Sequence, residues 1–492
     1  MKGLKRIVIL LLITTCNIQA QQIILSLDRV IDIAADSSLE SFRSKNIYMS
    51  SYWEFRSYRA ERLPSLTMDI TPARYYRDIV QRYDSENDID VYRPQQSYFA
   101  SGGFAVKQNF DLLGGSFFAN SDLSYLRNFG TINQNQYSSI PIRVGYSQNL
   151  LGYNRFKWER RIEPLKYEMA KKEFLFNLEK INEQAISNFF TLAMAQAEYD
   201  LAKKNVSSTD TLYQMGQQRH KIASISQADL LTLKLDAVNA RNTLQNADIA
   251  LKRAMFGLAS FLNLDQQAQI RLLLPNRPSQ MNISVDKALT LARENNPQFL
   301  ELRKQVLEAE QSVDKTKKES LFNASINASI GFNQMAYSFQ DVYRDPMRQD
   351  VFSVSVSIPL LDWGVRKGRY NMAKNNLNII QISSQQTELT IEEDVIMTVG
   401  DFNIQQDMIV SAEEALDLAV MAYTETRQRF IIGSADINSL TLSLNRQQEA
   451  QRNYITALQN YWLSYFKIRR LTLFDFAAGL SLSSSFDFNH GL

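Results

Sequence analysis

Cysteine and histidine are nearly absent from this chain of 492 residues, which contains one Cys and two His. No glycine-rich phosphate-binding loop is present either. Most metal sites and catalytic triads require several reactive side chains of these kinds in one place. We therefore predict that the chain has no catalytic residues, no metal site and no cofactor, and that it is not an enzyme.

Long apolar runs are also missing. Beyond the N-terminus, no run approaches the ~18 residues that a transmembrane helix needs. A form of this chain that crosses a membrane must therefore be a closed β-barrel, because lipid leaves unpaired backbone groups unsatisfied. The net charge is only +2, so the composition gives no indication of nucleic-acid binding.

The N-terminus has the pattern of a secretory signal peptide. A basic segment, MKGLKR, precedes an apolar one, IVILLLITT, and small Ala20 stands before QQ. We expect residues 1–20 to be removed, which leaves the mature chain without cysteine and without disulfides. The alternative that Cys16 carries a lipid stays open, although Thr15 stands where a lipobox has Gly, Ala or Ser.

The chain contains two copies of one unit. LSLDRVIDIAADSS from Leu25 aligns with ISVDKALTLARENN from Ile283, at an offset of 258 residues. RHKIASISQADLL from Arg219 aligns with RFIIGSADINSLT from Arg429, at an offset of 210. The first copy therefore has 48 extra residues (258 minus 210), within 66–144, which we interpret as an inserted strand-turn-strand unit.

Several segments alternate between apolar and small polar residues with a period of two, as in LFNASINASIGF (321–332). An apolar side of this length, opposite Asn, Ser and Gly, fits a strand that crosses a membrane beside a wet lumen. The alternative is a strand of a soluble β-sandwich. The side predicted to face lipid includes Phe322, Ile326, Ile330, Val354 and Val356.

Long tracts with helical periodicity and almost no Gly or Pro follow the strands. Their apolar residues recur at spacings of three and four, as in a coiled-coil seam. The first tract has 66 residues and would extend about 99 Å as a helix, which two shorter returning helices can match together. The predicted helices span 26–62, 154–219, 226–262, 284–320, 364–429 and 436–468.

The predicted organisation combines these segments into two tandem repeats. Four strands, or six with the insertion, are too few to close a barrel, so a barrel would be shared among subunits. The predicted parts are a signal peptide (1–20), a first repeat (21–263, strands about 63–151), an equatorial connection (264–283), a second repeat (284–468, strands about 321–361) and a C-terminal equatorial tail (469–492).

The chain resembles the TolC family of outer-membrane efflux channels. The resemblance rests on VSVSIPLLDWGVRKGRYNMAKNNL, on RFIIGSADINSLTLSLNRQQEAQRNYITALQNYW, and on the openings LDRVIDIAADSS and VDKALTLARENNPQ. It implies a mixed α and β fold: a trimeric transmembrane β-barrel continued by a long periplasmic α-helical coiled-coil barrel. Such a barrel has twelve strands, four per protomer. We expect the insertion to be a flap or plug; six strands per protomer, and eighteen in all, is the alternative.

The resemblance also implies a function. It predicts an outer-membrane channel that extends into the periplasm and serves a tripartite efflux or type I secretion system as a passive exit duct for small molecules or proteins. Its partners would be two further copies, a periplasmic adaptor, an inner-membrane pump or ABC transporter, and outer-membrane lipid. The competing interpretation is a lipid-anchored periplasmic coiled-coil scaffold or adaptor without a closed barrel.

Two aligned turns, 222–229 and 432–439, are predicted to form the periplasmic tip. Members of the family close this end with acidic side chains and bind the adaptor there, and a ring of carboxylates in a narrow pore favours cations. The equally weighted alternative is a helix N-cap for Asp436, beside Ser434, and a solvated acid in the first helical turn for Asp229. Gly433 is predicted to permit its turn. The tip and gate candidates are Asp229, Asp436, Ser224, Gly433 and Ser439.

Overall fold

The computed structural model describes residues 22–111, 113–129, 133–150, 152–222, 225–266 and 268–485. The predicted signal peptide, with Cys16, lies outside these ranges. The chain forms two compact units, each built from separate segments. The sheet unit consists of Ser50–Met169 and Leu300–Thr387, and the helical unit of Met1–Met49, Ala170–Phe299 and Glu388–Leu492.

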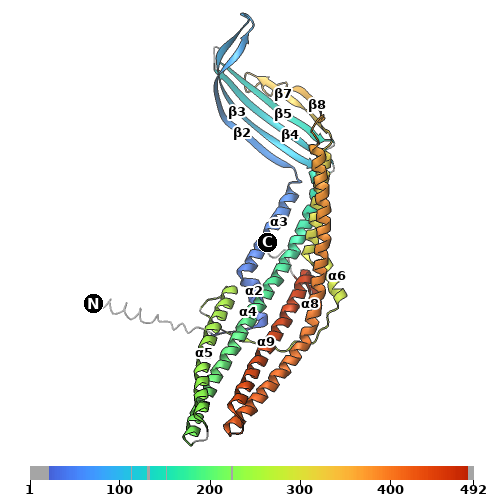
Figure 1. Cartoon of the computed structure of the whole chain (residues 1–492). Helices are drawn as coiled ribbons and strands as arrows, with labels where there is room; N and C mark the ends of the chain where they lie inside the picture. Colours follow the sequence, from blue (N-terminus) through green and yellow to red (C-terminus); the bar gives the residue numbers. More distant parts are fainter. Residues whose placement is uncertain are drawn as a thin grey trace, which may run out of the picture. The chain divides into compact units, whose positions relative to one another are not determined.

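The sheet unit contains six strands in the order β2-β3-β4-β5-β7-β8, and each neighbouring pair runs antiparallel (Figure 1). The pairing of β5 with β7 joins strands from the two halves of the sequence. The strands are β2 (Ser65–Asp84), β3 (Ile89–Phe110), β4 (Gly115–Phe129), β5 (Gln134–Asn149), β7 (Asn323–Ala336) and β8 (Met347–Ser357).

The inserted hairpin lies within this sheet. β3 pairs with β2 from Ile89 to Lys107, with one irregularity between Thr71 and Arg74 of β2, and β4 pairs with both β3 and β5. The expectation of a flap or plug is therefore wrong. The reason is that Phe104 and Val106 of β3, and Phe117 and Ala119 of β4, continue the apolar alternation of their neighbours, so these strands fit the sheet on both sides.

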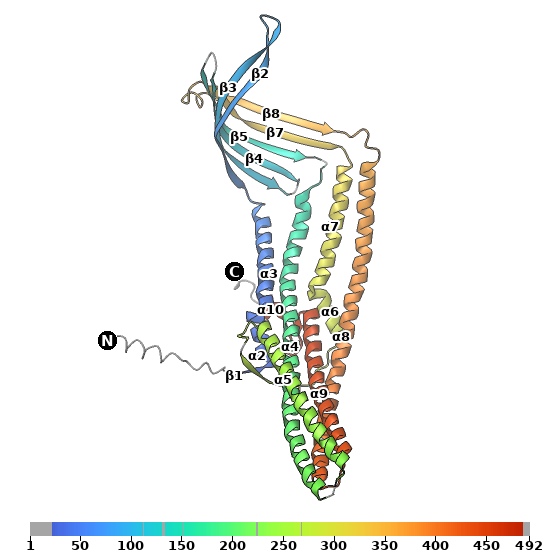
Figure 2. The ribbon, with the colours of Figure 1, turned by 60° about the vertical axis from the view of Figure 1, so that its left-hand side comes forward.

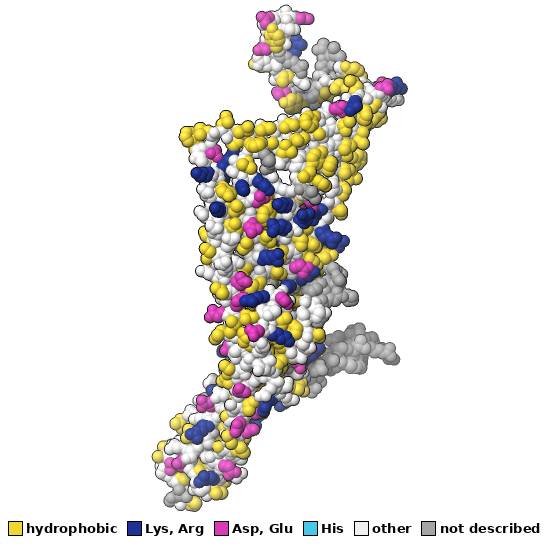
Figure 3. Space-filling view, turned by 90° about the vertical axis from the view of Figure 1, so that its right-hand side faces the viewer, with side chains coloured by type: hydrophobic (Ala, Val, Ile, Leu, Met, Phe, Trp, Pro, Cys, Tyr) yellow, Lys and Arg dark blue, Asp and Glu magenta, His cyan; other side chains and the backbone are white. Residues whose placement is uncertain are grey.

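The register of the strands gives the sheet one apolar face. Val106 lies opposite Ala119, Val144 opposite Ile330, and the side chains of directly opposed residues point to the same face. This apolar face is exposed in the single chain, and hydrophobic side chains gather over it in Figure 3. Its large exposed members include Leu66, Met68, Ile70, Phe104, Phe117, Ile142, Val144, Ile330, Phe352, Val354 and Val356.

The remaining elements are mainly long helices (Figure 2). Four of them, α3, α4, α7 and α8, have residues in both units. The helices are α2 (Leu27–Ser37), α3 (Leu39–Ala60), α4 (Arg155–Lys221), α5 (Gln227–Phe261), α6 (Val285–Asn295), α7 (Pro297–Glu319), α8 (Val365–Ile431), α9 (Ile437–Thr472) and the short α10 (Leu482–Ser485).

Two helices predicted as continuous are each broken. The segment 284–320 divides at Asn296, because Pro297 has no amide hydrogen to donate and begins α7. The segment 26–62 divides at Ser38, whose hydroxyl accepts a hydrogen bond from the amide of Ser41 at 3.2 Å. The two breaks are 258 residues apart (296 minus 38), which is the offset by which the two halves of the sequence align.

Two short strands were not predicted. β1 (Gln22–Ser26) and β6 (Gln269–Leu273) pair in parallel within the helical unit. The side chain of Gln196 on α4 holds β6 by donating to the carbonyl of Ile270 at 2.8 Å and accepting from the amide of Leu272 at 3.1 Å. The predicted connection 264–283 is therefore partly a strand. Near the C-terminus, β9 (Phe474–Asp475) and β10 (Leu480–Ser481) form a second small sheet.

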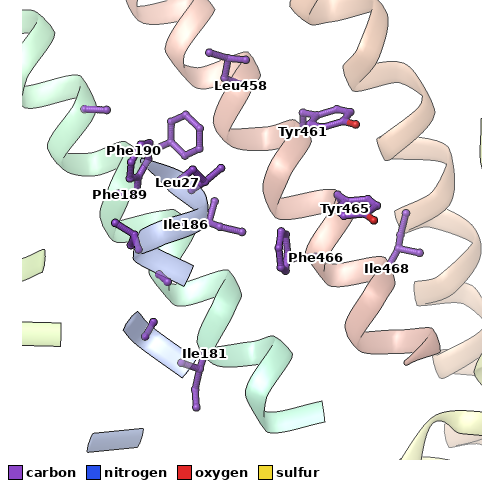
Figure 4. Packing of buried hydrophobic residues seen from close by; sticks show 14 of the residues in the cluster. Leu27, Ile181, Ile186, Phe189, Phe190, Leu458, Tyr461, Tyr465, Phe466 and Ile468 are labelled. Carbon is purple, nitrogen blue, oxygen red and sulfur yellow. The ribbon is translucent and has the colours of Figure 1, made fainter. Parts of the chain in front are cut away.

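The core of the helical unit lies where α4 and α9 approach the start of the chain. Phe189 and Phe190 of α4 and Leu458 of α9 are almost completely buried. Leu27 of α2 lies beside the α4 side chains in Figure 4. The ring of Phe402 on α8 is 5.1 Å from that of Tyr461, which brings the fourth helix into this core.

Buried ion pairs hold the end of α9 against α4. Arg469 contacts Glu179 at 3.0 Å and Asp475 at 3.1 Å, and Arg470 contacts Glu183 at 2.6 Å. Both arginines belong to the last turn of α9. The helix therefore ends at Thr472, and the predicted end at residue 468 is four residues too early. Burial raises the pKa of Glu179 to about 7, although Arg469 opposes this rise.

A matched pair of leucines on α9 tests the position of the core. Leu458 is fully buried, whereas Leu442 is 52% exposed. We expect Leu458→Ala to lower the free energy of unfolding by about 2–5 kcal/mol, because it leaves a cavity, and Leu442→Ala by about 0.5 kcal/mol or less. Denaturant unfolding followed by circular dichroism measures both, and equal losses would contradict the assignment of Leu458 to the core.

The buried Glu179 predicts a pH dependence of stability. Its pKa is raised above the usual 4.5 to about 7, so the folded protein keeps a proton that the unfolded chain releases. Stability therefore falls as the pH rises through this window. We expect Glu179→Gln to flatten the change in melting temperature between pH 5 and pH 7. Glu198→Gln, which removes an ion pair of α4 with Arg452, is the control and should leave that change in place.

Candidate functional site

The predicted tip corresponds to the ends of two helical hairpins, α4–α5 and α8–α9, in the helical unit. Side chains from both hairpins line one groove of about 710 Å³, which we call the tip groove. Its members include Arg219, Asp229, Phe430 and Asp436. Both candidate acids therefore lie on one feature of the surface, as the alignment of the two turns predicts.

Arg219 joins the two hairpins. Its Nη2 atom donates a hydrogen bond to the carbonyl oxygen of Ile431 at 2.6 Å, and its guanidinium lies 5.9 Å from the centre of the Phe430 ring. Phe430 in turn packs in a small buried cluster with Leu212, Leu233 and Leu440. The ends of the two hairpins are thus linked in two ways. Arg219 of α4 contacts residues of α8, and the apolar cluster contains residues from both hairpins.

Gly433 ends α8 in a left-handed conformation, with φ of +85°. The amide of Ser434 donates to the carbonyl of Arg429 at 2.8 Å, and the amide of Gly433 donates to that of Phe430 at 3.0 Å. This pair of bonds is a Schellman motif, which satisfies the last carbonyls of the helix. The positive φ favours glycine there because a side chain would strain the backbone.

Both candidate acids cap the start of a helix. Asp436 is the N-cap of α9 and accepts a hydrogen bond from the amide of Ser439 at 2.6 Å, and this bond lowers the pKa of the carboxyl group. In α5 the N-cap is Ser226, which accepts from the amide of Asp229 at 3.1 Å, while Asp229 accepts from the Ser226 amide at 3.1 Å. The latter arrangement is a capping box.

The two caps use the same residue types in exchanged roles. At the offset of 210, Ser226 aligns with Asp436 and Asp229 aligns with Ser439. Ser439 stands where the first copy has an acid, and its amide is the donor to the Asp436 carboxylate. In the structure both carboxylates accept hydrogen bonds at helix starts, and a gating role stays a prediction.

Two exposed isoleucines of the tip were missed. Ile222 and Ile432 are 76% and 77% exposed, and they occupy equivalent places in the two turns, 210 residues apart. The alignment already contained the signal, because it places an isoleucine at the same position of both predicted turns. Ser224 lies outside the described residues.

The residues predicted to face lipid lie on or beside the apolar face of the sheet. Ile330, Val354 and Val356 are about half exposed, and Ile326 lies on the same face directly opposite Val354. Ile326 is less exposed than the others. Phe322 is 43% exposed and directly precedes β7. The alternation read from the sequence thus corresponds to one face of the sheet.

None of the helices in the described ranges combines the length and the apolar character that crossing a membrane requires. Among the residues that the structure describes, no three or more His, Cys, Asp or Glu side chains come together in a way that could hold a metal ion.

The fold is that of bacterial outer-membrane channels. The structure is similar to the CmeC outer membrane channel of Campylobacter jejuni, with 11% identity, a TM-score of 0.67, and coverage of 94% of this chain and 90% of that one. It is also similar to the outer membrane protein VceC of Vibrio cholerae (14%, TM-score 0.62, coverage 91% and 95%) and to the MtrE outer membrane channel of Neisseria gonorrhoeae (12%, 0.58, 91% and 88%).

Part of the second half of the sequence matches a protein-family model. Residues 288–472 match the family model described as "Outer membrane efflux protein". A comparison with curated proteins finds no match. The predicted resemblance to the TolC-like outer-membrane efflux proteins is therefore confirmed, together with the predicted location in the outer membrane with an extension into the periplasm. The family match supports a channel role in efflux.

Two substitutions of Asp436 separate capping from charge. Asp436→Ala removes the acceptor for the Ser439 amide, so we expect several-fold faster hydrogen exchange at the start of α9. Asp436→Asn keeps an acceptor and should restore the protection, because Asn caps helices as well as Asp does. Exchange measured by mass spectrometry on both variants checks this, and equal exchange in Asp436→Ala and the unaltered protein would contradict the cap.

Proposed function

We propose that this chain is the outer-membrane channel of a tripartite efflux or type I secretion system, a passive exit duct for small molecules or proteins. The observation that carries the proposal is the exposed apolar face of the sheet, because a large apolar face on a single chain requires lipid or protein to cover it. The shared fold with solved outer-membrane channels supports lipid as the cover.

The proposed assembly is a homotrimer in which three copies close one transmembrane β-barrel and one periplasmic α-helical barrel. It is supported by apolar residues on α8 that remain exposed in the single chain. Leu389, Ile396 and Ile404 recur along α8 at spacings of seven and eight and are 67%, 43% and 59% exposed. Such a stripe fits a coiled-coil seam against another copy. The aligned helix breaks and caps support two tandem repeats per chain, joined at 264–283.

The tip is the proposed contact with a periplasmic adaptor, which would connect the channel to an inner-membrane pump or ABC transporter. The exposed Ile222 and Ile432 support this role, because each offers an apolar anchor at an equivalent place in the two turns. Asp229 and Asp436 are proposed to act electrostatically on transport in addition to capping, since three copies would bring six carboxylates to the tip. The partners would supply the energy for transport.

The first test is fractionation of the outer membrane with an alkaline wash, followed by electrophoresis of heated and unheated samples. We expect a band that resists the wash and migrates as a trimer until the sample is boiled, because a closed barrel pairs its backbone groups within itself and leaves no edge. A monomer that the alkaline wash releases would contradict the channel and favour the lipid-anchored periplasmic scaffold or adaptor.

A further inference from the structure

We propose that each copy contributes all six strands to the wall of the shared barrel, and that β8 of one copy pairs with β2 of the next. A trimer would then have eighteen strands instead of the twelve that the family resemblance implies. This inference rests on the proposed function and goes beyond it, because it assigns the inserted hairpin to the wall and names the two edges that join the copies.

The inserted hairpin has tight contacts on both of its flanks in the sheet. A Cβ atom added to Gly145 of β5 would lie 2.3 Å from the ring of Phe118 on β4, so the ring occupies the space above this glycine. On the other flank, the hydroxyl of Thr67 on β2 donates a hydrogen bond to the carbonyl oxygen of Ala105 on β3 at 3.3 Å. Aromatic side chains over strand glycines stabilise a sheet, and these contacts would be lost in a detached flap.

A wall without the hairpin would require a different sheet. β2 and β5 would have to become neighbours, although in this structure β3 and β4 lie between them. Three strand spacings separate β2 from β5, about 14 Å. Both long hydrogen-bonded ladders that bind the hairpin, β2 with β3 and β4 with β5, would have to break. The six-strand arrangement keeps every one of these backbone bonds.

The two outer strands are suited to pair with each other. In the described sheet β2 and β8 each have a single neighbour, and they run in opposite directions because the number of strands is even. β2 starts at Ser65, shortly after α3, and β8 ends at Ser357, shortly before α8. Existing neighbours meet near such ends, as Asn323 does opposite Ser357. The 11 residues of β8 would therefore face the first part of β2.

The pairing also preserves the two faces. Thr67 of β2 and Ser355 of β8 lie on the polar side, and Met68 and Val354 lie on the apolar face. An antiparallel pair with Thr67 near Ser355 continues both faces from one copy to the next without a break. Because barrel diameter grows roughly linearly with strand number, the wall would be about 1.5 times as wide as a twelve-strand one and would leave an aqueous passage.

Disulfide formation between copies tests the edges. In full-length protein with Cys16→Ser in the outer membrane, Thr67→Cys is combined with Ser353→Cys, Ser355→Cys or Ser357→Cys to cover neighbouring registers. We expect mild oxidation of at least one pair to give covalent dimers and trimers that survive boiling. The control, Met68→Cys with Ser355→Cys, places the thiols on opposite faces and should give none.

Disulfide formation within one copy tests the hairpin. Asn120 of β4 lies opposite Arg143 of β5, with Arg143 Nε donating to Asn120 Oδ1 at 3.0 Å, so Asn120→Cys with Arg143→Cys should cross-link inside the assembled channel. Ser65→Cys with Ser147→Cys should not, because β3 and β4 lie between these strands and disulfides need Cα atoms within about 7 Å. A wall formed without the hairpin would place Ser65 opposite Ser147, because Asn323 lies opposite Ser357 and the two halves align at offsets of 258 and 210.

The outcomes separate this inference from the proposed function. A boiling-sensitive trimer that forms the Ser65–Ser147 link overturns the six-strand wall but leaves the channel intact. A trimer without any link between β2 and β8 in the three registers overturns the edge pairing. A monomer released by alkali overturns the channel itself. Links between copies and within the β4–β5 pair, without the Ser65–Ser147 link, support eighteen strands.

Discussion

Hydrogen bonding between six alternating strands is the constraint on which the rest of the structure depends. The ladders fix the register, and the register collects apolar side chains from Met68 at one edge to Val354 at the other on a single face. This face and the two outer strands are both unfavourable in water, because apolar surface and unpaired backbone groups remain exposed. In the proposed assembly, lipid over the face and another copy at each edge would remove both of these costs.

The acids at the tip of the helical unit stabilise the starts of two helices. α5 and α9 each begin with an aspartate and a serine that lie three positions apart in the sequence. Each pair satisfies backbone amides that would otherwise lack partners. A carboxylate that accepts such a bond is held in one orientation. Any electrostatic role of Asp229 or Asp436 in transport would therefore act from a fixed position, and the substitution Asp436→Asn would remove the charge while the helix start remains formed.

Long periodic segments were predictable and long-range pairing was not. The helix predicted at 154–219 is α4, Arg155–Lys221, because about sixty residues of helical periodicity leave no competing structure. The break before Pro297 could have been read from the proline, whereas the break at Ser38 has no such marker. β1 and β6 have five residues each and are strands only because Gln22 meets Gln269 across most of the first half of the chain. At the tip, composition revealed the acids, but their capping geometry needed coordinates.

The position of the inserted hairpin follows from the topology of the chain. Each half must leave the helices, enter the sheet and return to the helices at the same end of the strands, so an insertion can add strands only in pairs. The 48 extra residues make one such pair, β3 and β4, and β5 still runs back toward α4. Because both new strands also carry the apolar alternation of their neighbours, the sheet accepts them without a change of face. A wider sheet is therefore a simpler result of this insertion than a separate flap, which would leave the apolar sides of β3 and β4 uncovered.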